Sequence, residues 1–346
     1  MVCTHNDGSY WNKLIALGIT PHDLVLRKLS LSTLFKLLNI LRKEKPDLIH
    51  THGKGPGLYG RLLGWMLGIP VVHTFHGFQH KLLPVVQRWF YLFVENVLTL
   101  LTRHHIFVGN GEKNKAKVLM FLNDSNSSVV NNGIDLDSIQ ALPPAEEVLA
   151  SLKLGPRESI KIFGTLSRVS PEKGLDILLE GFVEAAKRAP YIRLLVIGDC
   201  PGEHEKYIKM ITQYIHENGL DDAVKILGAR EDALEILKSI DFYISPSRSE
   251  GLPYNLLEAL AVGKPVMATD IPGNNDIIRK SVEGILVPVN SARTLAHGIL
   301  TLLELGPEER KAMRQNGKVR IRDEFSLNLM SEKTFSIYKK VLEGVI

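Results

Sequence analysis

The sequence predicts an α/β protein with two doubly wound, parallel-sheet domains that face a central cleft. Short β-branched or apolar runs alternate with longer helical patterns along the 346 residues, and this alternation is typical of parallel sheets covered on both faces. Apolar runs such as Leu-Leu-Val-Ile at 194–197 suit strands that are buried on both sides. Because ligands of such sheets bind at the carboxyl ends of the strands, we expect the site in the cleft.

Four short strands and three helices are expected in the front half. The strands are expected at 48–50, 71–74, 105–108 and 128–131, and the helices at 32–43, 57–67 and 83–101. The pattern breaks between residues 132 and 154, at an Asn-Asn-Gly turn and a Pro pair. The charge balance also changes there: 15 Lys and Arg stand against 7 Asp and Glu up to residue 131, and 27 against 31 afterwards.

In the back half, six expected strands are each followed by a helical segment. They are expected at 160–163, 192–197, 224–227, 242–246, 266–269 and 284–288. We therefore predict a Rossmann-like domain over 1–140, a second one over 141–325, and a C-terminal helix over 326–346 that packs back toward the first domain.

The composition excludes several classes of protein. With 45% hydrophobic and 23% charged residues, the chain has the usage of a globular protein. Two cysteines form no disulfide framework, which favours a reducing, cytoplasmic setting. The longest apolar stretch, 89–101, contains Glu95 and Asn96 and is shorter than the roughly 20 residues of a membrane span. The basic residues are scattered, so we expect no nucleic acid partner.

The segment 245–259 carries two carboxylates on a strand, a loop and a helix. Gly251 lets the backbone approach a ligand, and Pro253 stands where a helix begins. The amides at that helix start favour phosphate oxygens, whereas Glu250 and Glu258 suit hydrogen bonds from sugar or ribose hydroxyls. Solvated acids at a helix start are an alternative of equal weight.

A pair of cations follows the first strand of the back domain. Arg168 and Lys173 lie on the loop between that strand and its helix, with Gly174 at the turn. Two cations at this edge can bind a diphosphate and stabilise the charge of a leaving group, and a solvated loop is the alternative. A third loop at the same edge begins with Gly198, which alone is only a turn signal.

Together these loops resemble the retaining GT-B glycosyltransferases of family 4. Glu250 and Glu258 have the family's spacing of two Glu separated by seven residues. Similar motifs are Ser-Arg168-x4-Lys173-Gly174, Ser245-Pro-Ser-x2-Glu250-Gly-Leu-Pro, Glu258-Ala-Leu-Ala-Val-Gly-Lys-Pro-Val, His50-Thr-His52-Gly, Thr74-Phe-His76-Gly77 and Asn132-Gly-Ile-Asp135. The resemblance covers nearly the whole chain and implies a GT-B fold and a nucleotide-sugar donor, with UDP as the expected nucleotide.

The resemblance also implies roles for the matching residues. Arg168 and Lys173 would hold the donor diphosphate, Glu250 the transferred sugar and Glu258 the ribose hydroxyls. His76 would line the reacting centre on the sugar side. The other donor-binding positions would be Gly198, Arg230 beside the base, Gly251, Leu252 and Pro253, with the backbone amides up to Asn255.

The resemblance further implies a retaining transfer of a hexosyl unit without a metal or other cofactor. The donor phosphate would accept the proton of the acceptor, which is a glycan or a lipid-linked molecule of bacterial surface polysaccharide or glycolipid assembly. The place of action would be the cytoplasm, at the inner face of the plasma membrane. A phosphorylase of the same fold is disfavoured, because no lysine-anchored pyridoxal site is recognisable.

The start of the chain differs from the family pattern. Relatives begin with a strand, a Gly-rich turn and a first helix, whereas residues 1–8 here resemble the family's second strand and its loop. We therefore expect a front domain that lacks the first strand–helix unit of roughly 30 residues. The alternative to an active enzyme is a nucleotide-sugar-binding remnant with impaired catalysis.

Three further features have competing interpretations. Asp135-Leu-Asp137 spells a metal-binding motif of another glycosyltransferase fold, but a chance match in the linker is favoured. His50 and His52 share one face of a strand, and a partly buried pair is favoured over a metal site. The basic, aromatic segment 78–105 predicts contact with an anionic membrane surface, and a helix that packs its aromatic residues into the front domain is the favoured alternative.

Overall fold

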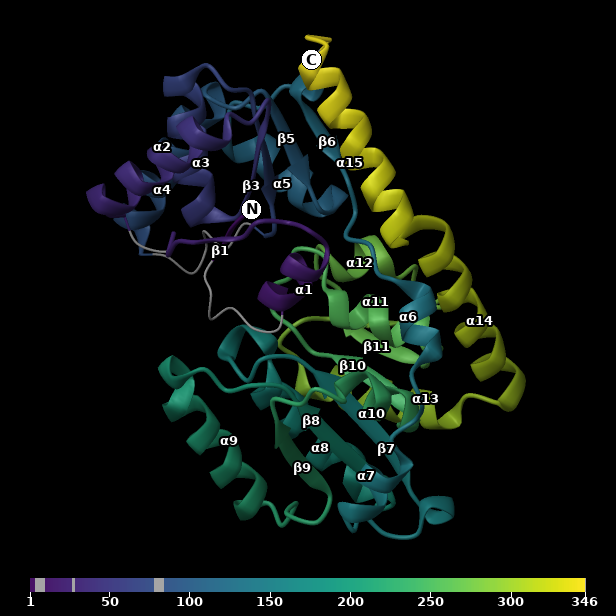
Figure 1. The fold of residues 1–346 in the computed structure, drawn as a ribbon. Coiled ribbons are helices and arrows are strands. Elements are labelled where there is room, and N and C mark those ends of the chain that lie inside the picture. Colours follow the sequence, from purple (N-terminus) through teal and green to yellow (C-terminus); the bar gives the residue numbers. More distant parts are fainter. Residues whose placement is uncertain (4–9, 27–28, 78–83, 346) are drawn as a thin grey trace. The chain divides into compact units, whose positions relative to one another are not determined.

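The computed structural model describes residues 1–3, 10–26, 29–77 and 84–345, which form two compact units (Figure 1). Unit 1 comprises Met1–Val108, Glu112–Val130 and Glu332–Ile346, and unit 2 comprises Gly109–Gly111 and Asn131–Ser331. Each unit contains a parallel sheet with helices, as the alternation in the sequence predicts. The sequence predicts domain limits at residues 140 and 326, and both positions lie within unit 2.

Unit 2 contains a six-stranded parallel sheet with the order β12-β11-β10-β7-β8-β9. The strands are β7 (Lys161–Leu166), β8 (Ile192–Ile197), β9 (Val224–Gly228), β10 (Phe242–Ser245), β11 (Val266–Thr269) and β12 (Gly284–Val287). The strand order reverses between β7 and β10, so the connections that leave these two strands diverge from one edge. In doubly wound sheets this switch point is where ligands bind.

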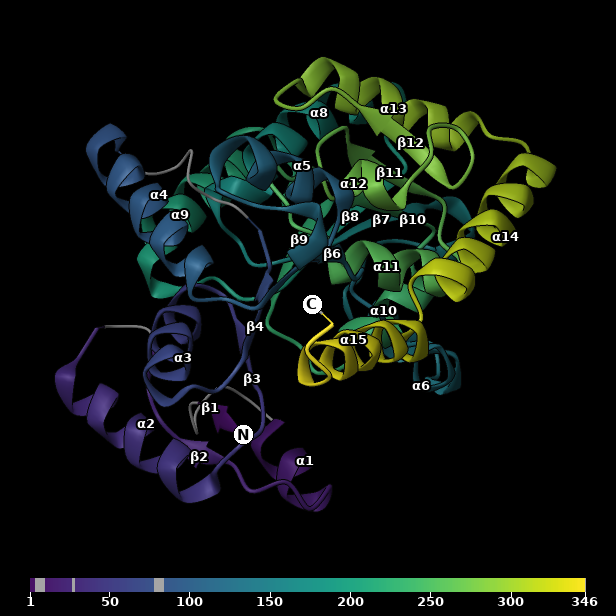
Figure 2. The ribbon, with the colours of Figure 1, turned by 90° about the horizontal axis from the view of Figure 1, so that it is seen from above.

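Helices cover both faces of this sheet (Figure 2). Leu175, Leu178, Leu179 and Phe182 recur at helical spacing on α8 (Leu175–Arg188) and are buried in the core. The same core includes residues of α9 (Glu205–Glu217) and α13 (Ala292–Glu304). The opposite face carries α10 (Ala233–Ser239) and α11 (Tyr254–Ala261), and α11 packs against α14 (Pro307–Glu324). Three short helices complete the unit, namely α6 (Leu136–Ala141), α7 (Glu146–Ser151) and α12 (Asn274–Ile277).

Unit 1 contains a four-stranded parallel sheet whose strands follow chain order. The strands are β3 (Ile49–His52), β4 (Val71–Phe75), β5 (His104–Phe107) and β6 (Ser127–Val129). The helices are α2 (Leu31–Glu44), α3 (Lys54–Leu67), α4 (Val85–Leu100) and α5 (Asn110–Leu119). The C-terminal helix α15 (Leu327–Leu342) crosses the limit between the two units in the chain. None of the helices in the described part combines the length and hydropathy that a membrane crossing requires.

The first residues form small elements, of which the sequence predicts only the first strand. β1 (Val2–Cys3) pairs in parallel with β2 (His22–Asp23), and α1 (Tyr10–Ala16) lies between them in the chain. Two-residue strands are too short for an alternating pattern. The expected strand near the start coincides with β1, and the loop expected after it, residues 4–8, lies outside the described residues.

Candidate functional site

The loops that leave β7 and β10 meet through an ion pair that is largely shielded from solvent. Lys173 Nζ lies 2.7 Å from Glu250 Oε1, and their side chains are only 16% and 8% exposed. The Ser247 hydroxyl donates to the same carboxylate oxygen at 2.6 Å. Glu250 Oε2 has no partner among the residues the structure describes, so it remains available to accept a hydrogen bond. Two of the predicted site residues, Lys173 and Glu250, are thus in direct contact with each other.

The turn that carries Lys173 is held against the β10 loop by backbone and side-chain contacts. The Arg248 amide donates to the Glu172 carbonyl at 2.8 Å, and its guanidinium forms two 2.8 Å hydrogen bonds with Asp176. Gly174 adopts a φ of 68°, and a Cβ there would lie 2.2 Å from the Pro246 carbonyl oxygen. Only glycine fits this left-handed, closely packed position.

Glu258 lies on α11, the helix that follows the Glu250 loop. Its side chain has no hydrogen bond or ion pair within the described part of the chain, and burial raises its pKa to about 7. Burial also raises the pKa of Tyr243. The negative charges of Glu250 and Glu258 raise it further, whereas the contact with the Leu166 carbonyl lowers it. Both carboxylates therefore lie near this one buried phenol.

Side-chain amides fix the loop between the two carboxylates. Asn132 Nδ2 donates to the carbonyl of the buried Leu252 at 2.8 Å, and the Asn255 amide donates to the Leu166 carbonyl at the end of β7. α11 begins directly after Pro253, so its first amides are at the carboxyl edge of the sheet. The Gly251 backbone is closely packed against Gly273, where a Cβ would lie 2.6 Å from the Gly251 carbonyl oxygen.

Arg168 and Gly198 lie beside one another on neighbouring strand ends. Gly198 has a φ of 142°, and a Cβ there would lie 2.0 Å from the Ser167 carbonyl oxygen and 3.3 Å from the Arg168 amide nitrogen. The glycine thus allows the loops after β7 and β8 to approach. The Arg168 guanidinium is 58% exposed and lies 3.8 Å from Glu172, so its cation is accessible to a ligand.

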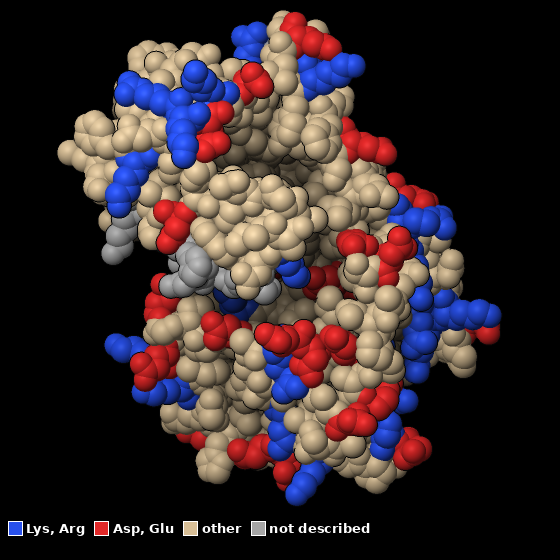
Figure 3. Space-filling model, viewed as in Figure 1, with Lys and Arg blue, Asp and Glu red and all other residues tan. Residues whose placement is uncertain are grey.

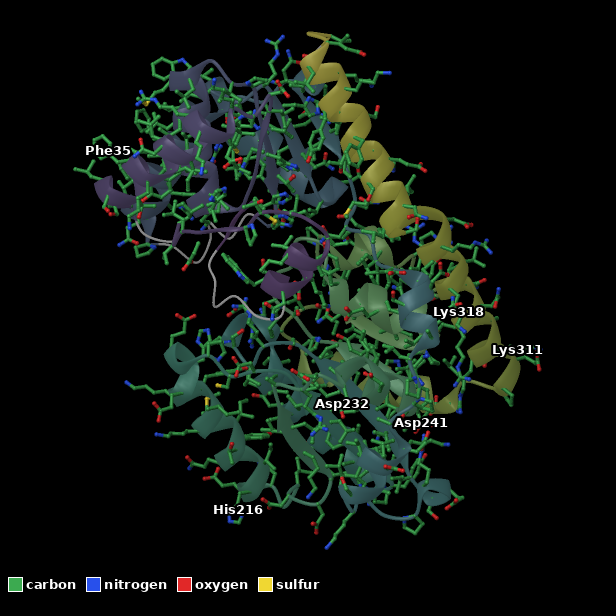
Figure 4. All side chains as sticks on the ribbon, viewed as in Figure 1. Phe35, His216, Asp232, Asp241, Lys311 and Lys318 are labelled. Carbon is green, nitrogen blue, oxygen red and sulfur yellow. The ribbon has the colours of Figure 1, made fainter. Side chains whose placement is uncertain are left out.

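Arg230 lies apart from this group of contacts, on the loop after β9. Its guanidinium forms two 2.7 Å hydrogen bonds with Asp232, which precedes α10 (Figure 4). The structure records no contact of Arg230 with the other predicted site residues in the described part of the chain. Its expected position beside a base stays a prediction.

His76 lies in unit 1, at the end of a row of three histidine rings. His52 Nδ1 lies 2.8 Å from His76 Nε2, and the ring centroids of His50 and His52 are 4.2 Å apart. His50 has partners on both nitrogens, with Nδ1 2.5 Å from the Tyr338 hydroxyl and Nε2 2.7 Å from Thr74 Oγ1. Burial lowers the pKa of His50 to about 3 and that of His76 to about 4, so these rings are neutral at pH 7.

The Asp135-Leu-Asp137 motif has a structural use. Asp135 caps α6, because its carboxylate accepts from the Ser138 amide at 3.1 Å and from the Ser138 hydroxyl at 2.5 Å. Within the described ranges no group of three His, Cys, Asp or Glu residues has an arrangement that suits a metal ion.

Three of the four aromatic residues of α4 are exposed, whereas Tyr91 packs against the core of unit 1. Trp89, Phe90 and Phe93 are 66%, 68% and 65% exposed, although Leu92 and Leu98 on the opposite side of the helix are buried. The favoured expectation, that this helix packs its aromatic residues inward, is wrong for these three side chains. Residues 78–83 of the predicted segment lie outside the described residues.

Two residues that hold the site together, Ser247 and Arg248, could not be recognised from the sequence pattern. Ser247 and Arg248 stand inside the motif around Glu250, but spacing gave no indication that they bind Glu250 and Asp176. Arg248 and Asp176 are 72 residues apart in the chain, so their contact depends on the adjacency of β7 and β10. An Arg within a loop of otherwise small and acidic residues was the available signal.

Two family models match the chain. Glycosyltransferase Family 4 matches residues 2–138, and Glycosyl transferases group 1 matches residues 151–320. The chain is 28% identical over 330 residues to the UDP-Gal:alpha-D-GlcNAc-diphosphoundecaprenol alpha-1,3-galactosyltransferase of Escherichia coli, which covers 90% of this chain and 77% of that protein. It is 28% identical over 283 residues to the alpha-monoglucosyldiacylglycerol synthase of Streptococcus pneumoniae, with 79% and 62% covered.

Solved structures share the fold over almost the full chain. A glycosyltransferase from Rickettsia africae superposes with a TM-score of 0.83 at 22% identity and covers 99% of this chain and 90% of that one. Anabaena HepE in complex with UDP-glucose also superposes with a TM-score of 0.83, at 20% identity, with 96% and 90% covered. The chain therefore belongs to the group 1, family 4 glycosyltransferases and is a glycosyltransferase with the GT-B fold.

Proposed function

We propose that the chain transfers a hexosyl unit from a UDP-sugar to a lipid-linked or glycan acceptor, with retention of configuration and without a metal ion. The observation that carries this proposal is the Lys173–Glu250 pair at the switch point of unit 2. It sets a cation for a diphosphate directly beside a carboxylate for sugar hydroxyls. HepE, which shares the fold, is solved with UDP and with UDP-glucose, which supports UDP as the nucleotide.

In the proposed step, an acceptor hydroxyl attacks the anomeric carbon while the bond from that carbon to the donor phosphate breaks. The phosphate oxygen takes the hydroxyl proton, and UDP leaves. Lys173, Arg168 and the amides at the start of α11 stabilise the charge on the diphosphate. Glu250 Oε2 accepts from a hydroxyl of the sugar, and His76 accepts a hydrogen bond from a substrate hydroxyl. Glu258 accepts from the ribose hydroxyls.

Transfer from radiolabelled UDP-sugars to a membrane-lipid extract tests this function. We expect a labelled lipid product with the wild-type chain and its loss in Glu250→Ala, while Glu217→Ala, an exposed carboxylate on α9, keeps the activity. Retention is checked by the anomeric configuration of the product. Binding of UDP-sugars without turnover would instead support the alternative of a remnant with impaired catalysis.

We also propose that the transferase works at the surface of an anionic membrane, at the inner leaflet. The E. coli and S. pneumoniae relatives are named for lipid substrates or products, and Val86, Trp89, Phe90, Phe93, Val97 and Leu100 form one exposed apolar face of α4. Unit 1 carries 18 Lys and Arg against 9 Asp and Glu. In Figure 3 blue side chains lie among uncharged surface of this unit.

An interfacial helix gains affinity from apolar burial together with attraction of basic groups to anionic lipids. Each aromatic side chain contributes about 1.5–3 kcal/mol when it is fully removed from water. Three such side chains on one helix face therefore supply enough free energy for reversible attachment without a membrane-spanning segment.

Co-sedimentation with vesicles tests the membrane proposal separately from transfer. Binding to vesicles that contain phosphatidylglycerol is expected to fall in the Trp89→Ser, Phe90→Ser, Phe93→Ser triple variant and in Arg88→Glu. Phe335→Ser on α15 is the matched control, because Phe335 is exposed to the same extent, 68%. Absence of binding by the wild-type chain, or equal binding by all forms, contradicts this part of the proposal.

A further inference from the structure

The proposed function assigns no role to His52, the middle ring of the row of histidines in unit 1. It lies between His50 and His76: its centroid is 4.2 Å from that of His50 and 5.1 Å from that of His76. The Nδ1 atom of His52 and the Nε2 atom of His76 are 2.8 Å apart. At this distance one of the two nitrogens carries the hydrogen and the other accepts it.

The position of His52 is itself determined by its neighbour. His50 is held at both nitrogens, by the Tyr338 hydroxyl from α15 and by Thr74 Oγ1 from β4. Because His50 and His52 stand two residues apart on β3, their rings project from the same face. The packing of His52 on the fixed His50 ring therefore sets the direction of its Nδ1 atom toward His76.

The intrinsic preference of imidazole indicates which nitrogen donates. A neutral histidine side chain carries its hydrogen more often on Nε2 than on Nδ1. If both rings adopt this form, His76 Nε2–H donates to the lone pair of His52 Nδ1, and neither ring takes its less stable tautomer. The Nδ1 atom of His76 then keeps its lone pair and accepts hydrogen bonds.

We propose that His52 is a positioning residue that holds His76 in the Nε2–H tautomer and so presents His76 Nδ1 as an acceptor for a hydroxyl of the substrate. This inference rests on the proposed function only in its last step, the identity of the hydroxyl. Burial lowers the pKa of His52, and that of His76 to about 4, which keeps the pair neutral at pH 7.

The tautomer is measured directly by ¹⁵N NMR of the chain labelled at histidine, without any substrate. His76→Gln assigns the His76 signals. We expect a protonated Nε2 and an unprotonated Nδ1 for His76 in the wild type, and shifts toward an average of both tautomers in His52→Leu. His52→Asn restores the wild-type pattern, because its amide oxygen can accept near the position of Nδ1.

Kinetics provide the second readout. His52→Leu is expected to lower kcat about three- to tenfold, the effect of one lost hydrogen bond, with the KM for donor unchanged, and His52→Asn recovers most of the rate. A His76 ring protonated on Nδ1, or His76 signals that are the same in His52→Leu, overturns the inference. A chain with the expected NMR pattern but no transfer refutes the proposed function and leaves the pairing of the two rings intact.

Discussion

Replacement of Glu258 by Gln is expected to remove a pH dependence of donor binding. Burial raises the pKa of Glu258 to about 7, whereas the ionised carboxylate is the form that accepts two ribose hydroxyl hydrogen bonds most strongly. If only the ionised form binds, protonation weakens the apparent affinity by a factor of about 11 at pH 6 and about 1.1 at pH 8. The wild-type Kd for UDP-glucose therefore falls about tenfold between these pH values.

Calorimetric titration of UDP-glucose at pH 6, 7 and 8 measures this change, because the diphosphate of a nucleotide sugar does not titrate in this range. The Glu258→Gln variant is expected to show a flat profile, and the exposed Glu180→Gln on α8 the wild-type profile. A flat wild-type profile, or the same slope in Glu258→Gln, refutes the assignment of Glu258 to the ribose.

The same pKa predicts the stability of the ligand-free chain. Since the folded pKa exceeds the ordinary value of 4.5, folding favours the protonated carboxyl. Its contribution is fully present below pH 4.5 and is lost as the pH rises through 7. The difference between the two pKa values corresponds to about 3 kcal/mol. Glu258→Gln is therefore expected to melt at a higher temperature than the wild type at pH 8 and at a similar one at pH 5.

Three further predictions concern the frame of the site. Lys173→Met and Glu250→Gln each leave the partner's charge unpaired, and each is expected to lower the free energy of unfolding by about 3 kcal/mol. In urea denaturation, the double variant is expected to lose less than the sum of the two single losses. Additive losses would contradict the pairing. In Gly174→Ala the new Cβ would clash with the Pro246 carbonyl oxygen, so this variant is expected to lose more stability than Gly219→Ala. Gly219 has a similar φ of 63° but open space around it. Equal losses in thermal melts would contradict the close contact at Gly174. Arg248→Lys loses the bidentate contact with Asp176 and is expected to weaken UDP-glucose binding about three- to tenfold. Arg322→Lys on α14 is the control and is expected to bind like the wild type. Equal affinity of the two variants would argue against a positioning role of Arg248.

The strands of both sheets could be predicted because each one is a short apolar run between helical patterns. The Leu-Leu-Val-Ile run at 194–197 is completely buried in β8, as a doubly covered sheet requires. The elements that were missed are local. β2 contains two residues, and α1, α6 and α7 contain six or seven, so they are too short to generate a period. The ten-residue α5 was missed as well, because Ala116, Val118 and Leu119 are its only apolar side chains.

The site could be predicted as a set of loops but not as a set of contacts. Because β7 and β10 are parallel, the loops that carry Lys173 and Glu250 lie at the same edge of the sheet. The two residues are 77 positions apart in the chain, and it is the pairing of β7 with β10 that brings Lys173 Nζ to 2.7 Å from Glu250 Oε1. The sequence pattern also does not show whether a given side chain faces the core or the solvent. The spacing on α4 marks an amphipathic helix but does not say that its aromatic face is the exposed one, and Phe35 of α2 also projects outward (Figure 4).

The proposed function requires that Lys173 and Arg168 of unit 2 bind the diphosphate of a nucleotide sugar. The direct measurement is calorimetric titration of UDP-glucose into the wild type, Lys173→Gln, Arg168→Gln and the control Lys187→Gln, an exposed cation on α8. We expect the two site variants to bind about tenfold or more weakly, the effect of one lost charged contact, and Lys187→Gln to bind like the wild type. Equal affinity of Lys173→Gln and the wild type would show that Lys173 does not bind the diphosphate.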